Sequence, residues 1–82
     1  MVSLVEQYKT DGEFKNNGAA QSLLAQLDTV NHFEQSGEME KTKHHMYNFR
    51  QLLENHKEQN LISDKAFGIL DANAKYLLGK WN

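Results

Sequence analysis

The histidines are the residues of this sequence best suited to a chemical role, because imidazole can act both as a metal ligand and as a general base. His44 and His45 are adjacent, and Glu40 precedes His44 by four residues, a spacing that puts two ligands on one helix face. Adjacent helical residues point about 100° apart, so only one of the two histidines can join that face. A third ligand would have to come from His32 or Glu34, which no motif singles out. We therefore predict no metal and no cofactor, with His45 partly buried beside the core and His44 in solvent.

Catalysis by a nucleophile or by paired carboxylates is not indicated either. Glu38 and Glu40 would lie in the solvated first turn of a helix, where nothing raises a pKa for acid catalysis. A helical bundle of this size also has little room for a pocket that excludes water. We therefore predict that the protein is not an enzyme. The serines are assigned to helix caps or helix surfaces: Ser3, Ser22, Ser36 and Ser63.

Three aromatic residues are candidates for ligand contact. Tyr47 and Tyr76 fall outside the apolar stripes described below, and Trp81 lies near the end of the last stripe. Exposed aromatic faces of this kind can stack on sugar rings. The remaining large side chains at helical spacing could also line a ligand groove, but this spacing is far more typical of an ordinary core: Met39, Met46, Phe49 and Phe67.

These candidates are positioned by a central helix, predicted over Met39 to Lys57. Its apolar or nearly apolar residues recur at alternating intervals of three and four, which places one stripe along a helix that is half buried. Phe49, in the middle of the stripe, is expected to meet both neighbouring helices. The stripe consists of Met39, Thr42, Met46, Phe49, Leu53 and His56.

A second helix is predicted from Gly18 to Ser36, after an N-cap at Asn16 or Asn17. Ser36 and Gly37 form a C-cap signature, and only three residues separate this helix from the central one. So short a connection makes the two helices an antiparallel hairpin.

The last and first helices complete the predicted fold. Ser63 would cap a helix that packs to the end of the chain, and Ser3 would cap a short helix that stops at Asp11-Gly12. Phe14 is expected to anchor the following linker to the core. The sequence thus predicts an all-α fold: a three-helix up-down-up bundle with a short additional N-terminal helix, which we expect to cap one end.

Composition indicates a single soluble domain covering residues 1–82. Hydrophobic residues make up 39% and charged residues 24%, and no apolar run approaches the roughly 20 residues needed to span a membrane. The formal net charge is -2, and the nine Lys and Arg residues are dispersed, which makes a nucleic acid an unfavourable partner. There is no cysteine, so composition is neutral about redox compartment.

The order of these features resembles the FIMAH family, a small helical module found in secreted multidomain hydrolases of Gram-positive bacteria. The N-terminal part is similar at Leu4-Val5-Glu6-Gln7-Tyr8, Gly12, Asn17-Gly18 and Leu23-Leu24-Ala25-Gln26-Leu27. Thr42 departs from the small alanine usual in the family, and His44 adds a second histidine. The matching residues from Gly37 onward are Gly37, Lys41, His45-Met46, Phe49, Ile62-Ser63, Ala66, Leu70, Ala72, Ala74 and Leu77-Leu78.

This resemblance implies an extracellular or cell-wall location and an accessory role beside a hydrolase, with Met1 as an artificial start of a piece excised from a larger protein. It transfers no catalytic motif. Our first hypothesis is a non-catalytic module that binds a polysaccharide or a cell-surface protein, besides contacting neighbouring domains of its parent. The alternatives are a structural spacer without a ligand and an intracellular regulatory helical bundle.

Overall fold

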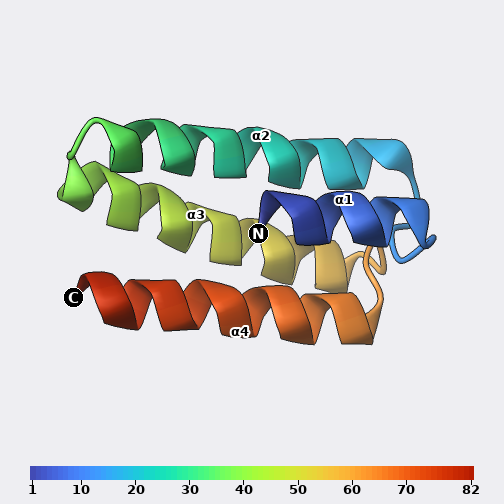
Figure 1. The fold of residues 1–82 in the computed structure, drawn as a ribbon. Coiled ribbons are helices and arrows are strands. Elements are labelled where there is room, and N and C mark those ends of the chain that lie inside the picture. Colours follow the sequence, from blue (N-terminus) through green and yellow to red (C-terminus); the bar gives the residue numbers. More distant parts are fainter.

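The computed structural model describes residues 1–82 and contains four α-helices and no sheet (Figure 1). This confirms the all-α prediction and the short additional helix at the N-terminus. No helix combines the length and the apolar character needed to cross a membrane. The helices are α1 (Val2–Thr10), α2 (Asn17–Gln35), α3 (Met39–Glu58) and α4 (Asp64–Trp81).

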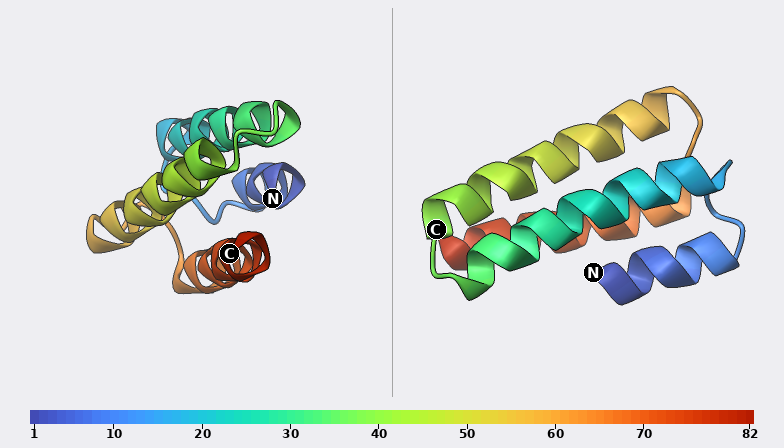
Figure 2. Two further views of the ribbon diagram at one scale, coloured as in Figure 1. Left: turned by 90° about the vertical axis from the view of Figure 1, so that its left-hand side faces the viewer. Right: turned by 90° about the horizontal axis from the view of Figure 1, so that it is seen from above.

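The helices lie side by side with their axes roughly aligned, and the chain turns back between α2 and α3 and again between α3 and α4 (Figure 1). α3 packs on both α2 and α4, whose backbones do not come close to each other. α1 lies along the side of the molecule, between α2 and α4 (Figure 2). The expectation that the first helix caps an end is therefore wrong, because the apolar face of α1 fills the space between two long helices.

The starts of α2 and α4 are capped by side chains, as the sequence indicated. The Asn16 side-chain oxygen accepts a hydrogen bond from the Ala19 backbone N–H at 2.8 Å, and the Ser63 hydroxyl oxygen accepts one from the Ala66 N–H at 3.1 Å. The predicted cap at Ser3 is wrong. α1 already begins at Val2, so Ser3 lies inside its first turn.

The ends of α1 and α2 depend on glycine. Gly12 and Gly37 follow these helices with φ angles of +80° and +78°, in the left-handed region that side chains other than glycine adopt at a cost. Both turns fall where the sequence predicted them.

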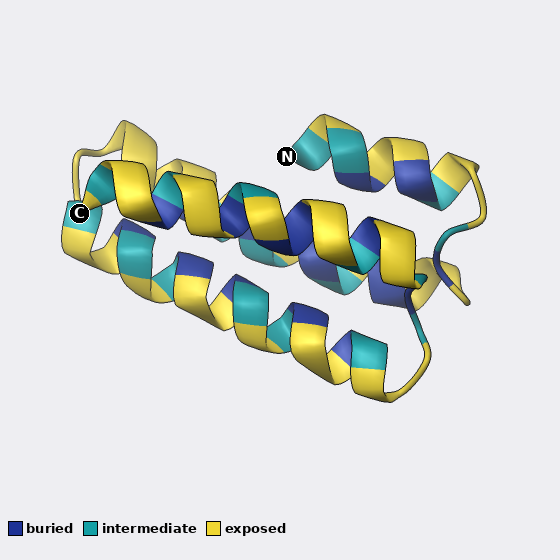
Figure 3. Ribbon diagram, turned by 90° about the horizontal axis from the view of Figure 1, so that it is seen from below, coloured by how far each residue is buried: buried dark blue, intermediate teal, exposed yellow.

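The core runs along the inward faces of all four helices, where buried residues alternate with exposed ones on the outer faces (Figure 3). The stripe of α3 is confirmed: five of its predicted residues are buried, and Met39 is half buried. Thr42 is fully buried, and its hydroxyl donates to the Glu38 carbonyl at 3.0 Å, so no polar atom is left unpaired. The five are Thr42, Met46, Phe49, Leu53 and His56.

The two loops at one end of the bundle are joined by backbone hydrogen bonds. Lys15 donates to the Leu61 carbonyl and Ser63 donates to the Glu13 carbonyl, both at 2.9 Å, on either side of an antiparallel pairing of Phe14 with Ile62. Phe14 is buried, which confirms its predicted role as an anchor.

Candidate functional site

The candidate site is an open stretch of the groove between α2 and α4. α1 has nine residues, whereas α2, α3 and α4 have 19, 20 and 18. At 1.5 Å per residue, α1 therefore covers about half the length of this groove. The uncovered half extends from the start of α1 toward the C-terminal ends of α2 and α4 (Figure 1, Figure 2).

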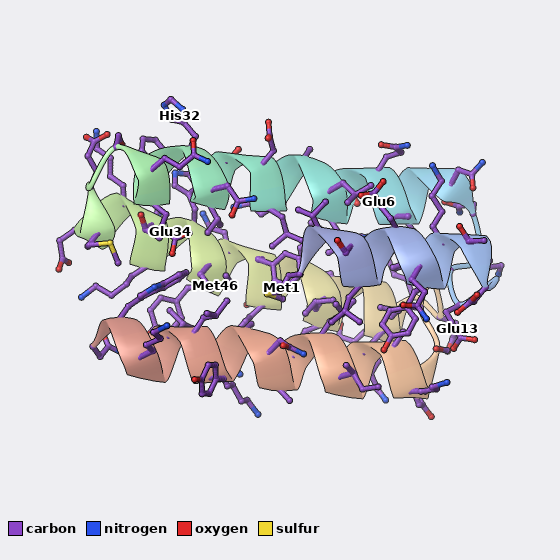
Figure 4. All side chains as sticks on the ribbon, in the orientation of Figure 1. Met1, Glu6, Glu13, His32, Glu34 and Met46 are labelled. Carbon is purple, nitrogen blue, oxygen red and sulfur yellow. The ribbon has the colours of Figure 1, made fainter.

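This uncovered half, which we call the half-groove, contains a hollow of about 300 Å³. Met1, Glu34 and Met46 lie around it from the start of α1, from α2 and from α3 (Figure 4). The volume is at the lower limit of typical ligand pockets, and the lining is apolar with a few polar groups, as in such pockets. The apolar residues are Met1, Val2, Leu27, Val30, Met46, Leu77 and Trp81, and the polar ones are Ser3, Asn31 and Glu34.

The polar residues contributed by α2 lie on the rim of the half-groove. Asn31 and Glu34 are exposed, and Glu34 takes part in none of the five ion pairs of the chain. The rim of α2 therefore offers a carboxylate that is free to meet an incoming cation.

The three aromatic candidates lie in different places. Tyr47 and Tyr76 are 51% and 70% exposed, as their sequence positions suggested, whereas Trp81 is half buried. Trp81 lines the half-groove, Tyr47 lines a shallow hollow beside His44 and Asn82, and Tyr76 lines no hollow. The structure thus does not bring the three together, and of them only Trp81 reaches the candidate site.

The histidine candidates lie at the α2–α3 hairpin. His44 is exposed and His45 is half buried, as predicted. The His45 ring stacks on Phe33 with 5.1 Å between ring centroids and 10° between planes, and His32 meets Phe33 edge-on at 5.3 Å. No three His, Cys, Asp or Glu side chains are grouped so that they could hold a metal ion.

A serine and a histidine that lie 34 positions apart meet between α2 and α3, which the sequence analysis did not foresee. His56 Nε2 lies 3.0 Å from both the Ser22 hydroxyl oxygen and the Ala19 carbonyl oxygen, and the Ser22 hydroxyl donates to the same carbonyl at 2.9 Å. The Ala19 carbonyl thus contacts both the Ser22 hydroxyl and His56 Nε2, and the role of this ring nitrogen depends on the tautomer of His56. The arrangement fastens the end of α3 to the start of α2. In the sequence, the only indication of this contact was the place of His56 in the stripe of the central helix that was predicted to be buried.

Comparison with protein families identifies the family of this chain. The model of the FIMAH domain matches residues 1–79 of this chain. The chain belongs to the FIMAH family. Neither the curated proteins nor the solved structures contain a significant match to it.

Residues that carried the family resemblance form the inner surface of this FIMAH domain. Phe49, Ala66, Leu70 and Ala74 have no exposed surface, and Leu78 is 4% exposed. Ala66 and Ala74 are buried on α4, and their small side chains take little room in the core. These positions therefore belong to the core of this domain.

A charged cluster of Arg50, Asp71 and Lys75 connects α3 and α4 in this FIMAH domain. Asp71 Oδ1 accepts from Arg50 Nε at 3.0 Å, and Asp71 Oδ2 pairs with Lys75 Nζ at 3.1 Å. Burial raises the pKa of Asp71, but the hydrogen bonds from Arg50 and Lys75 outweigh it, so its pKa lies below the ordinary value. Asp71, Arg50 and Lys75 are all paired within this cluster, so we interpret the cluster as structural.

Proposed function

We propose that this FIMAH domain is a non-catalytic accessory module of a secreted or cell-wall-associated bacterial hydrolase, and that it binds a partner through the half-groove. The proposal treats α2, α3 and α4 as a rigid up-down-up bundle that presents this surface. The single observation that carries the proposal is the open, mostly apolar hollow beside Trp81.

Two further features support this proposal. The family resemblance implies a place beside a hydrolase domain, where a module that holds the enzyme near its substrate or cell surface would be useful. In addition, the Ala19 carbonyl contacts both the Ser22 hydroxyl and His56 Nε2, which supports a non-catalytic role. The lining of the half-groove contains one hydroxyl group, from Ser3, and neither a cysteine nor a histidine.

The proposal can be tested by titrating the ¹⁵N-labelled domain with soluble polysaccharides, cell-wall fragments and the purified hydrolase domain. We expect at least one of these to shift the amide resonances of half-groove residues and the fluorescence of Trp81, the sole tryptophan. Trp81→Ala should weaken binding, whereas Tyr76→Ala, which changes an exposed aromatic outside the half-groove, should not. The absence of any shift at millimolar concentration would count against a binding role.

A structural spacer without a ligand is the second candidate, and the rest of the surface favours it. Only three large apolar side chains are exposed, and no buried side-chain nitrogen or oxygen lacks a hydrogen-bond partner. Such a surface is ordinary for a domain with no partner. The spacer hypothesis predicts that Trp81 responds to none of the titrants, while deletion of the domain still alters the stability of the parent protein.

A further inference from the structure

We propose that Asn17 is a site of spontaneous covalent modification, at which the side-chain amide is lost by deamidation and the start of α2 is altered. The site is the pair Asn17-Gly18 at the N-terminal end of this helix. The reaction needs only water, so the inference is independent of the binding function proposed above.

The chemistry is an attack within the chain. The backbone nitrogen of Gly18 forms a bond to Cγ of Asn17, the bond from Cγ to Nδ2 breaks, and ammonia leaves with the proton that the backbone nitrogen has lost. The product is a succinimide ring. Water then opens the ring at either of its carbonyl carbons, which gives aspartate or isoaspartate, and in isoaspartate the main chain runs through Cγ. The net change is the loss of one ammonia molecule for each water molecule consumed.

The first argument is the state of the attacking nitrogen. Gly18 is the second residue of α2, and the first N–H groups of a helix have no partner within it. The side-chain oxygen of Asn16 accepts from the Ala19 N–H instead, and no backbone carbonyl accepts from Gly18. Glycine has no side chain to hinder the approach of the Asn17 amide. The nitrogen is therefore neither bonded nor shielded.

The second argument is the state of the amide. Asn17 and Gly18 are both exposed, and Asn17 borders an open hollow beside Thr10, where water reaches it. Asn16, rather than Asn17, caps α2, so no capping bond holds the Asn17 side chain in place. The amide is free to turn toward the Gly18 nitrogen.

The third argument is the place of the pair in the helix. The attack requires Asn17 to leave the helical conformation, because a helical ψ holds Cγ away from the next backbone nitrogen. Asn17 is the first residue of α2, so only the end turn has to open, and helix ends fray readily. The asparagines inside the helices are followed by residues with side chains, and their neighbours' N–H groups lie within the helix: Asn31, Asn48, Asn55 and Asn73.

The two products affect α2 in opposite directions. α2 has no acidic residue in its first turn, so aspartate at position 17 places a negative charge where the helix dipole favours it. Isoaspartate lengthens the main chain between Asn16 and Ala19, whose capping hydrogen bond measures 2.8 Å. The Ala19 carbonyl also lies 3.0 Å from His56 Nε2. Isoaspartate therefore removes the cap and loosens the attachment of α2 to the end of α3.

The experiment ages the domain at mildly alkaline pH in water labelled with ¹⁸O and maps the products by mass spectrometry of tryptic peptides. Trypsin places Asn17 in the peptide from Asn16 to Lys41, and fragmentation of this peptide locates the change. We expect Asn17 to react severalfold faster than Asn48, taking up one ¹⁸O atom. Equal rates at the two asparagines would overturn the proposal.

Asn17→Gln tests the site itself, because the longer side chain closes a ring far more slowly. It should remove most of the ammonia that the domain releases on ageing, whereas Asn48→Gln, at an exposed position inside α3, should leave the release unchanged. The same release from Asn17→Gln as from the wild type would overturn the proposal. The pair Asp11-Gly12 also forms isoaspartate by this route, but it releases no ammonia and lies in a separate tryptic peptide.

The structural consequence has its own readout. The isoaspartate form, separated by chromatography, should melt at a lower temperature than the unaged domain, with shifted resonances for the Ala19 amide and the His56 ring. Asn17→Asp should melt no lower than the wild type. Unchanged Ala19 and His56 resonances in the isoaspartate form would overturn the inferred effect on α2.

Discussion

Individual residues contribute very unequally to the stability of this domain. Phe49 lies in the middle of α3, the helix that packs on both α2 and α4, and it has no exposed surface. His44, five positions earlier on the same helix, is exposed. A domain of 82 residues has only a small core, so the loss of one large side chain is a sizeable fraction of its free energy of unfolding.

Phe49→Ala is therefore expected to lower the free energy of unfolding by about 3–5 kcal/mol, because it removes buried apolar surface and leaves a cavity. This is enough to leave the domain largely unfolded at 37 °C. His44→Ala on the same helix should be nearly silent. Thermal melts followed by circular dichroism measure both, and equal melting temperatures would contradict the assigned stripe.

Asp71 makes the stability dependent on pH. Although its burial raises the pKa, the hydrogen bonds from Arg50 and Lys75 lower it further, so the folded-state pKa lies below the ordinary value of 3.8. The contribution of Asp71 is fully present above that ordinary value and is lost as the pH falls through the folded-state pKa.

Asp71→Asn should thus cost about 1–3 kcal/mol at pH 7, because Arg50 loses a charged hydrogen-bond partner. The difference from the wild type should shrink as the pH falls below about 4. Urea titrations at a series of pH values measure this, with Asp28→Asn on the exposed face of α2 as a control. A difference that stays constant down to the lowest pH would show that the charge of Asp71 is not the cause.

At the scale of the helices, boundaries are set by local chemistry. Asn16 and Ser63 supply the oxygen atoms that the first N–H groups of α2 and α4 need, and Gly37 supplies the left-handed turn between α2 and α3. Each of these interactions lies within a few residues of the helix end that it serves. The elements therefore respond to substitutions in a way that local rules can predict.

Gly37→Ala should destabilise the domain by about 1 kcal/mol. A Cβ at this position would meet no atom within 4 Å, so the cost comes from the φ of +78° alone. Gly68→Ala is the matched control, because Gly68 lies inside α4 with open space around it and a helical φ. It should stabilise the domain by up to about 1 kcal/mol. Thermal melts should show shifts of opposite sign, and shifts of the same sign would contradict this account.

At the scale of the whole molecule, stability is distributed unevenly. α3 is covered on two sides by long helices, whereas α1 has nine residues, a length at which an isolated helix does not form in water. α1 is held only by its packing on α2 and α4, and its first turn borders the open half-groove.

Native-state hydrogen exchange should accordingly show the slowest amides in the middle of α3 and faster exchange throughout α1. The glycine variant Gly68→Ala provides a check, because it should slow the α3 amides that exchange by global unfolding. Equal protection of α1 and α3 would mean that the domain opens as one unit.

The sequence by itself determined where the long helices lie and which of their faces are buried. The stripe of α3 from Thr42 to His56, the cap at Ser63 and the turn at Gly37 were predicted correctly. For α2 the sequence offered Asn16 and Asn17 as caps, and Asn16 is the cap. These features follow from interactions between residues three or four apart, and such spacing can be read directly. The predicted cap at Ser3 was wrong, since a helix of nine residues depends more on its packing than on its first turn.

Only the tertiary structure decided where α1 packs and what it leaves uncovered. The half-groove joins Leu27, Met46 and Leu77, which the sequence placed in three separate stripes of a continuous core. Trp81 was a candidate from the sequence, but its separation from Tyr47 and Tyr76 was not foreseen, nor was the meeting of Ser22 with His56. Helical spacing predicts which residues of one helix face inward. It does not specify which neighbouring helix covers them, because that depends on contacts between residues far apart in the chain.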